Sequence, residues 1–367
     1  MFRSVDIRGF RQFREFKLTH LNRVNLLVGR NNAGKTTVLE AIEMLALGGR
    51  VASLQRSLRR RGEFSSEVLD DRTTFELDVR HLFYEHTLQA GAVFAIHATT
   101  DDEPALINCS IQNAQPEQRQ QTLLDDLELD PQLELRLSGF DNIEGSAFPL
   151  TPGGTIVSDP SRRLSSGGVR AGMPTVRGSD PVVFLGTEGA DANTLHQIWD
   201  SLVLTPEEVQ VTAAMKLVEP SIERLAFARR ELRSSSVAFV KLKDAEHRVP
   251  LDSFGDGTRR LLALAIFLAR ATGGVLLVDE IDTGLHYTAL ESMWRFVVDT
   301  ARRLDVQVFA TSHSGDCIRA LAWLQSDDPA LAADVTVHRI EKGQTTSVAY
   351  SAVEIETAAR HHVEVRG

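Results

Sequence analysis

One short loop carries the most recognisable chemistry in this chain. Residues 29–36, GRNNAGKT, match G-x-x-x-x-G-K-[ST] in full. Glycines let a backbone wrap around phosphate oxygens, so that successive N–H groups face an anion at the start of a helix. Lys35 would place a compact charge between β- and γ-phosphates, and the Thr36 hydroxyl is a ligand for Mg²⁺. The loop therefore predicts a nucleoside triphosphate site; the alternative is a coincidental glycine-rich turn.

Two adjacent carboxylates end an apolar run in the last third of the chain. The run is VLLVDE, residues 275–280. A buried strand would deliver Asp279 and Glu280 to the carboxyl edge of a parallel sheet, where ligands bind. There Asp279 would hold Mg²⁺ through water, and Glu280 would orient or deprotonate an attacking water. Alone, the pair could also be an ordinary polar exit from the core.

Two further segments are candidates for the same site. His313 follows the apolar strand expected over 306–310 and could hydrogen-bond a γ-phosphate or the attacking water. The turn SFGDG, residues 253–257, directly precedes an apolar helix, which makes it a second candidate anion site. The alternatives are a satisfied histidine at a strand end and a simple N-cap.

The elements around these residues follow from hydrophobic spacing. The pattern predicts strands within residues 1–20, an apolar strand over 24–28 and a helix after the glycine loop. Antiparallel strands are expected between about 73 and 140, and helices from 191 to about 233. In the last third we expect a strand at SVAFVKLK, a buried helix at TRRLLALAIFLARA, and then strand, helix and strand. Residues 50–62 look like a mobile basic connection, and 151–181 like a linker or adaptable loop.

Composition bounds the class of protein. The 367 residues carry 40 Lys plus Arg against 50 Asp plus Glu, a net charge of −10, which argues against a chain-wide nucleic-acid surface. Local clusters (Arg56 and 59–61; Arg229, Arg230 and Arg233) could still touch DNA, although solvated faces explain them as well. Two distant cysteines indicate neither a disulfide scaffold nor a zinc site. Without an apolar run of about 18 residues, we expect a cytoplasmic protein with no membrane span.

Taken together, five segments resemble a known group. IRGFRQF, GRNNAGKTT, SFGDGTRRLL, LLVDEIDTGLH and FATSHS are similar to motifs in the ABC-type ATPase heads of RecF, SMC and OLD proteins. The likeness is greatest to short prokaryotic OLD/RecF-like AAA ATPases without a Toprim domain, and it covers residues 1–48 and 236–320 well. Because the signature turn reads SFGDG and not LSGGQ, a transporter subunit is not expected.

The resemblance implies a role for each motif. Asp279 and Thr36 would bind the metal, and Glu280, His313 and Lys35 would be catalytic. Asp282 to His286 would form the D-loop. Arg8 and Arg11 could reach the nucleotide, with surface charge as the alternative. Nucleotide-binding residues would come from the Walker A loop (Gly29, Asn31, Asn32, Ala33, Gly34, Lys35, Thr36, Thr37) and from a signature turn acting on a second subunit (Ser253, Gly255, Gly257).

The expected fold is α/β: a P-loop NTPase of the ABC-head type with a mixed, largely parallel core sheet, an antiparallel β subdomain and a helical lobe. Residues 1–140 would form the N-terminal part of the head and 236–350 its C-terminal part. Residues 141–235 would be an insertion and 351–367 a tail.

The expected activity is hydrolysis of ATP with Mg²⁺ by two heads that close on the nucleotide, as a homodimer or a higher homo-oligomer. The cycle would pass to a separately encoded effector protein or to DNA, in antiphage defence by analogy with OLD-like ATPases. The alternatives are a RecF-like DNA-repair clamp and a nucleotide-gated scaffold with little turnover. GTP is not the expected substrate, because the sequence has no N-K-x-D motif to recognise the guanine base.

Overall fold

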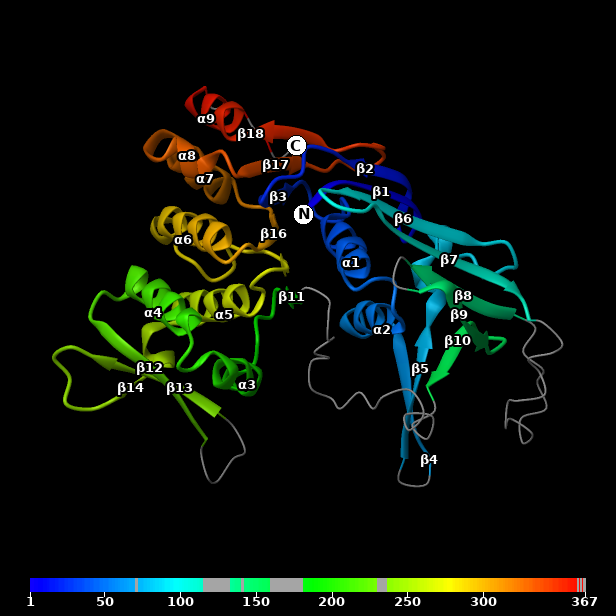
Figure 1. Cartoon of the computed structure of the whole chain (residues 1–367), viewed down its shortest axis with the longest axis horizontal. Helices are drawn as coiled ribbons and strands as arrows, with labels where there is room; N and C mark the ends of the chain where they lie inside the picture. Colours follow the sequence, from blue (N-terminus) through cyan, green and yellow to red (C-terminus); the bar gives the residue numbers. More distant parts are fainter. Residues whose placement is uncertain are drawn as a thin grey trace. The chain divides into compact units, whose positions relative to one another are not determined.

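The computed structural model describes residues 1–69, 72–114, 133–139, 142–158, 181–229 and 236–361, together with 363 and 365 (Figure 1). Most of the expected 151–181 loop, and Arg230 and Arg233, lie outside these ranges. The chain forms two compact units. We call them the core unit (residue 1, 19–39 and 180–367) and the β unit (2–18 and 40–179). The domain boundaries expected at 140, 235 and 350 stay a prediction.

A six-stranded sheet organises the core unit. Its order is β11-β15-β16-β3-β17-β18. The first five strands run parallel and β18 is antiparallel to β17. The strands that were expected to be apolar throughout are buried along their whole length, as in a sheet covered on both faces. The bounds are Val182–Leu185 (β11), Val275–Val278 (β15), Gln307–Ser312 (β16), Val24–Val28 (β3), Val335–Arg339 (β17) and Val348–Ser351 (β18). The expected α/β class is confirmed.

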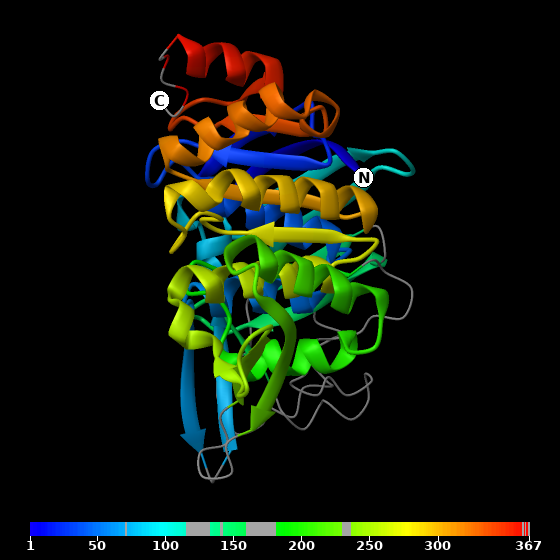
Figure 2. The ribbon, with the colours of Figure 1, turned by 90° about the vertical axis from the view of Figure 1, so that its left-hand side faces the viewer.

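Helices line one face of this sheet (Figures 1 and 2). The most buried is α5. All of its residues from Thr258 to Ala269 except Arg259 are buried, as its nearly uniform apolar sequence predicts. Trp294 of α6 is fully buried and its Nε1 donates to the Cys317 carbonyl of α7 at 3.0 Å. The helices are α3 (Ala192–Leu202), α4 (Pro206–Val218), α5 (Asp256–Arg270), α6 (Leu290–Arg303), α7 (Gly315–Asp327), α8 (Pro329–Ala332) and α9 (Ala352–Arg360).

Strand register places three loops at one edge of the core sheet. Ala310 pairs with Val278, and Ser312 pairs with Val28. Because these strands are parallel, the residues that follow them emerge side by side at the carboxyl edge. The glycine loop, the Asp279–Glu280 pair and His313 therefore share one edge, the usual ligand position in such sheets.

One expected helical stretch is a strand. Ile222–Arg229 forms β12, which pairs antiparallel with β13 (Ser236–Leu242), and β13 pairs with β14 (Val249–Pro250). The expectation of helix up to residue 233 is wrong here. Ile222 and Leu225 are buried three positions apart, a spacing that suits a helix as well, so pairing with β13 decides the conformation.

The β unit is built from antiparallel sheets. The larger has the order β2-β1-β6-β7-β8-β9 and the smaller β10-β5-β4, which confirms the antiparallel strands expected between 73 and 140. Phe10, Phe83 and Phe94 form a buried aromatic contact within it. The strands are β1 (Phe2–Phe10), β2 (Phe13–Leu18), β4 (Phe64–Leu69), β5 (Arg72–Asp78), β6 (Val93–Thr100), β7 (Ala105–Asn113), β8 (Leu133–Gly139), β9 (Asn142–Leu150) and β10 (Thr155–Ser158).

The basic segment after the glycine-loop helix is itself a helix. Val51–Arg60 forms α2, with Leu54 and Leu58 buried, so the mobile connection expected over 50–62 is wrong. The basic charge of this segment had suggested a solvated connection. Arg60 lies 2.8 Å from Glu43, and Arg61, just after the helix, lies 2.7 Å from Glu40. These arginines neutralise buried glutamates of the preceding helix, α1 (Lys35–Ala46), and are not a free basic surface.

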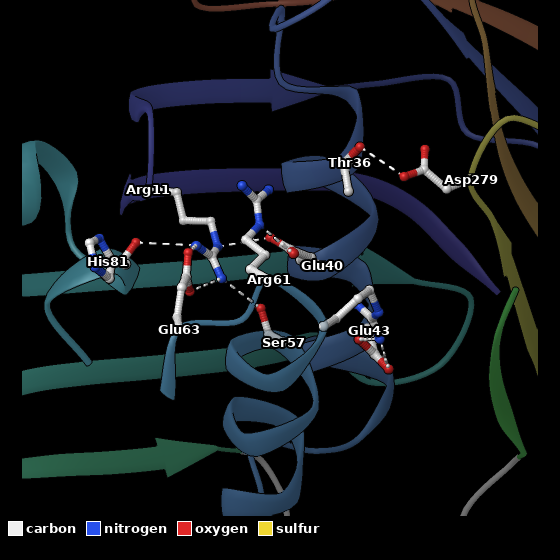
Figure 3. A network of polar contacts seen from close by, with 10 residues as sticks. Arg11, Thr36, Glu40, Glu43, Ser57, Arg61, Glu63, His81 and Asp279 are labelled. Carbon is white, nitrogen blue, oxygen red and sulfur yellow. Dashed lines mark hydrogen bonds and ion pairs between the residues drawn. The ribbon is translucent and has the colours of Figure 1, made fainter. Parts of the chain in front are cut away.

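Arg11 completes this charge cluster (Figure 3). It follows β1 with a left-handed φ of 53° and is 6% exposed. Its guanidinium forms ion pairs of 2.8 Å with both Glu40 and Glu63, and Nη2 donates to the Ser57 hydroxyl. Surface charge, one of the two interpretations of Arg11, is therefore wrong: the side chain joins α1, α2 and the β1–β2 turn.

Loss of this buried cation should destabilise the β unit. In Arg11→Met, Glu40 and Glu63 lose a charged partner inside the protein, and breaking a buried pair costs about 3–5 kcal/mol. The matched control is Arg3→Met, because Arg3 pairs with Asp101 at the surface, where such pairs contribute about 1 kcal/mol or less. Urea unfolding measures both. Equal losses in the two variants would contradict the structural role of the cluster.

Candidate active site

The glycine loop between β3 and α1 has the backbone of an anion cradle. Gly29, Asn32 and Gly34 have φ values of 148°, 61° and 108°. A Cβ on Gly29 would lie 2.3 Å from the Ile340 carbonyl, so only glycine fits there. Asn31 and Asn32 are exposed, whereas Ala33 and Thr37 are buried at the root of the loop. The loop thus presents its backbone, at the N-terminus of a twelve-residue helix, to a ligand.

Lys35 lies between the loop and the acidic strand end. Its Nζ donates to the carbonyls of Gly29 at 2.8 Å and Arg30 at 3.0 Å. Burial lowers the pKa of Lys35, while Asp279 and Glu280 act in the opposite direction. The ammonium group of Lys35 therefore lies beside the glycine loop before any phosphate binds there.

Asp279 is held at both carboxylate oxygens, and Figure 3 shows its contact with Thr36. Oδ2 accepts a hydrogen bond from the Thr36 hydroxyl at 3.0 Å, and Oδ1 accepts one from the Thr311 hydroxyl at 2.6 Å. The Asp279 N–H donates to the Leu185 carbonyl at 2.8 Å. The carboxylate is thereby fixed beside the first turn of α1.

The Thr36–Asp279 pair fits a magnesium ion. Neighbouring ligands of an octahedral Mg²⁺ lie about 3 Å apart, given metal–oxygen distances of about 2.1 Å, and the Thr36 Oγ1 to Asp279 Oδ2 distance is 3.0 Å. Within the part of the chain that the structure describes, no three His, Cys, Asp or Glu side chains converge on a metal position. The other ligands of such an ion would come from phosphate oxygens and water.

Glu280 has a strained backbone and a partly exposed carboxylate. Its φ of 51° is unusual for a residue with a side chain. Its N–H donates to the Thr311 hydroxyl at 2.8 Å, and Oε2 accepts from the Thr283 hydroxyl at 3.2 Å. Oε1 lies 3.3 Å from Nδ1 of His313, whose side chain is 55% exposed. A carboxylate so placed can accept a proton from a water molecule.

The turn over residues 253–257 is exposed and contains the N-cap residue of α5. That residue is Gly255, at φ 87°, and no side-chain hydrogen bond caps the helix, so the Ser253 hydroxyl takes no part in the cap. Ser253 and Gly255 are both exposed. A Cβ on Gly257 would lie 2.8 Å from the Gly284 carbonyl, which means that the turn packs closely on the 282–286 segment.

The structure thus brings Lys35, Thr36, Asp279, Glu280 and His313 together at one sheet edge. Sequence reasoning missed Thr311, whose hydroxyl contacts both Asp279 and Glu280. A signal existed. Once β15 and β16 are taken as parallel neighbours in register, the residue after Ala310 must lie beside the residue after Val278.

Removing the Thr311 hydroxyl should destabilise the fold. Thr311→Val keeps the shape but leaves the part-buried Glu280 N–H without its acceptor, at a cost of about 1–3 kcal/mol. Thr300→Val is the matched control, because Thr300 is a buried threonine of α6 whose hydroxyl has no hydrogen-bond partner among the described residues. Its stability should stay equal or rise. Urea unfolding that shows the same change in both variants would contradict the assigned role of Thr311.

Two family models match separate parts of the chain. Residues 4–131 match a family described as an AAA domain. Residues 210–316 match a second AAA-domain family, whose description also names the AbiEii toxin and type IV toxin–antitoxin systems. The second match includes the 253–257 turn, Asp279, Glu280 and His313.

Full-length likeness is more distant. An "ATP/GTP phosphatase" of Helicobacter pylori is 21% identical over 351 residues, which cover 88% of this chain and 87% of that protein. The SMC head domain from Thermotoga maritima is 12% identical with a TM-score of 0.42, covering 95% of this chain and 98% of that one. The Smc head of Pyrococcus furiosus, bound to the C-terminal domain of ScpA, is 10% identical with a TM-score of 0.47, covering 98% and 99%.

The assignment of the chain rests on the family matches and on the geometry of the site. No helix in the described ranges is long and apolar enough to cross a membrane. A complete phosphate-loop motif lies between a parallel strand and a helix, beside an acidic strand end, in a chain that matches AAA-domain families over two separate stretches. The chain has a P-loop NTPase fold and is an ATPase, and two separate stretches of it are similar to AAA-domain families.

Proposed function

We propose that two copies of this chain bind ATP·Mg²⁺ between them and hydrolyse it, as ABC-type heads do. The observation that carries the proposal is the double restraint on Asp279, which joins the phosphate loop through Thr36 to the third strand end through Thr311. Glu280 then lies next to a fixed metal ligand. The name of the Helicobacter pylori relative, an ATP/GTP phosphatase, supports turnover of a nucleotide.

Each residue of the site has a separate role in the proposed reaction. The loop N–H groups and Lys35 bind the β- and γ-phosphates, and Thr36 with Asp279 would hold Mg²⁺. When bound, the ion would neutralise charge that develops on the phosphoryl oxygens. Glu280 orients a water molecule and accepts its proton as the oxygen attacks γ-phosphorus and ADP leaves. His313 lies against Oε1 of Glu280 and fixes its direction. Positioning and electrostatics supply most of the acceleration.

We infer a second copy from the exposure of the 253–257 turn. Ser253 and Gly255 are exposed, and the Ser253 hydroxyl has no hydrogen-bond partner among the described residues. An exposed glycine-bearing turn that opens the fifteen-residue helix α5 suits an anion supplied from outside. We assign this turn to the γ-phosphate held by the partner copy.

The output of the cycle is a change in dimer geometry that a partner reads. We propose a separately encoded effector protein in antiphage defence, a role that agrees with the toxin–antitoxin system named in one family description. DNA is the second candidate. Pairing of Arg60 and Arg61 with Glu43 and Glu40 removes those two side chains from a DNA-binding surface. A cytoplasmic location fits these partners.

Glu280→Gln should separate binding from turnover. Loss of the proton acceptor should slow phosphate release roughly 10²-fold or more, while ATP still binds. Trapped ATP should then double the mass of the particle from 40.5 kDa, as measured by light scattering after gel filtration. Lys35→Ala should abolish both binding and dimers. Ser253→Arg in the Glu280→Gln background should keep ATP binding and lose the dimer.

Two results would contradict this proposal. If wild type and Glu280→Gln release phosphate equally slowly while ATP still drives assembly, the chain is a nucleotide-gated scaffold. If Glu280→Gln binds ATP and stays at the mass of one chain, the head-to-head dimer is wrong. ATP-stimulated DNA binding that falls steeply with salt would instead favour a repair clamp.

A further inference from the structure

Arg260 is a buried cation whose hydrogen bonds all go to backbone carbonyls. It lies in the second turn of α5 and is 7% exposed. Nη1 donates to the Gly186 carbonyl at 2.7 Å. Nη2 donates to the carbonyls of Asp279 at 2.8 Å and Glu280 at 2.9 Å. The guanidinium therefore joins the chain just after β11 to the chain just after β15.

This arrangement is costly and needs a reason. Burial lowers the pKa of Arg260, while the nearby carboxylates of Asp279, Asp282 and Glu280 favour the charged form. Its Nε has no hydrogen-bond partner among the described residues. An apolar side chain of similar size would fill the space without these penalties. What only a guanidinium offers is a planar set of donors that can hold several carbonyls in one fixed orientation.

The carbonyls that Arg260 holds flank the strained residue of the site. Glu280 has a left-handed backbone, which costs about 1–3 kcal/mol unless its surroundings impose it. Thr311 fixes the peptide before Glu280 through the Glu280 N–H, and Arg260 fixes the peptide after it through the Glu280 carbonyl. With both peptide planes fixed, the direction of the Cα–Cβ bond is fixed as well.

Arg260 also connects this residue to the exposed turn. It lies three residues after Gly257 on the same helix, and Gly257 packs against the Gly284 carbonyl. A movement of the turn along α5 would therefore move the guanidinium and the Glu280 peptide together. Both ends of this connection lie in the same chain. One end is the 253–257 turn, which we assign to the nucleotide of the partner copy, and the other is Glu280, the proton acceptor for the chain's own nucleotide.

Resting on the proposed ATP hydrolysis, we infer that Arg260 is a positioning residue that holds Glu280 in its reactive conformation and couples it to the 253–257 turn. Arg260 acts on the chemical step through Glu280 and takes no part in ATP binding by the phosphate loop. Its removal should lower kcat and leave the affinity for ATP unchanged.

The test compares Arg260→Met and Arg260→Lys with Arg270→Met, a control at the far end of the same helix. Arg260→Met should lower kcat roughly 10²-fold, the usual cost of a misplacement near 1 Å, with KM and the Kd for ATP within about twofold of wild type. Arg260→Lys, with one nitrogen for three carbonyls, should recover part of the rate. Arg270→Met should match wild type.

A double variant asks whether Arg260 acts through Glu280. Arg260→Met combined with Glu280→Gln should be no slower than Glu280→Gln alone, because residues that act as a unit are not additive. A further loss in the double variant, or a kcat of Arg260→Met within about threefold of wild type, would overturn the inference. A loss of ATP binding together with a lower kcat would also overturn it, because that result is expected of a residue with only a structural role.

The outcomes for the two proposals stay distinguishable. If Arg260→Met does not fold, Arg260→Lys, which keeps the charge and the aliphatic stem, is measured in its place: a kcat below that of wild type with an unchanged Kd for ATP supports the inference, and an unchanged kcat overturns it. If Glu280→Gln hydrolyses ATP as fast as wild type, the proposed role of Glu280 fails, and the positioning role of Arg260 fails with it. If Glu280→Gln is slow and Arg260→Met is not, only the inference about Arg260 fails.

Discussion

The carboxylate of Asp279 is the point on which the site depends. In the proposed mechanism Asp279 is a metal ligand, and its direction must be fixed before the nucleotide arrives, because reorientation during the reaction would lower the rate. Thr36 and Thr311 each hold one oxygen of this carboxylate. The two hydroxyls come from different elements, so the restraint forms only when β16 pairs in register with β15 on one side and with β3 on the other.

A second constraint acts on the next residue. The chain must turn sharply after the buried strand to bring Glu280 to the surface of the sheet edge, and it does so with a left-handed residue that is not glycine. The hydrogen bonds of Thr311 and Arg260 on either side stabilise that conformation. The strain therefore lies at the residue to which we assign the role of proton acceptor, where the surrounding core can support it.

Local chemistry made much of this predictable, and tertiary context decided the rest. The loop at 29–36 and the strand at 275–278 could be predicted from the sequence, because their residue types suit one structural context. The helix at 51–60 could not be predicted, because its arginines are typical of a solvated surface, and only the tertiary structure brings them to Glu40 and Glu43 of α1. The strand at 222–229 was missed for a related reason, since only pairing with β13 distinguishes it from a helix.

The most direct test of the account is the binding of Mn²⁺, as a paramagnetic substitute for Mg²⁺, to the Glu280→Gln protein loaded with ATP. Electron paramagnetic resonance counts the bound ion. We expect one tightly bound Mn²⁺ per chain only when ATP is present, with affinity at least tenfold weaker after a further Asp279→Asn change, while metal-free ATP binding persists. Equal Mn²⁺ affinity with and without the Asp279 carboxylate would contradict the account.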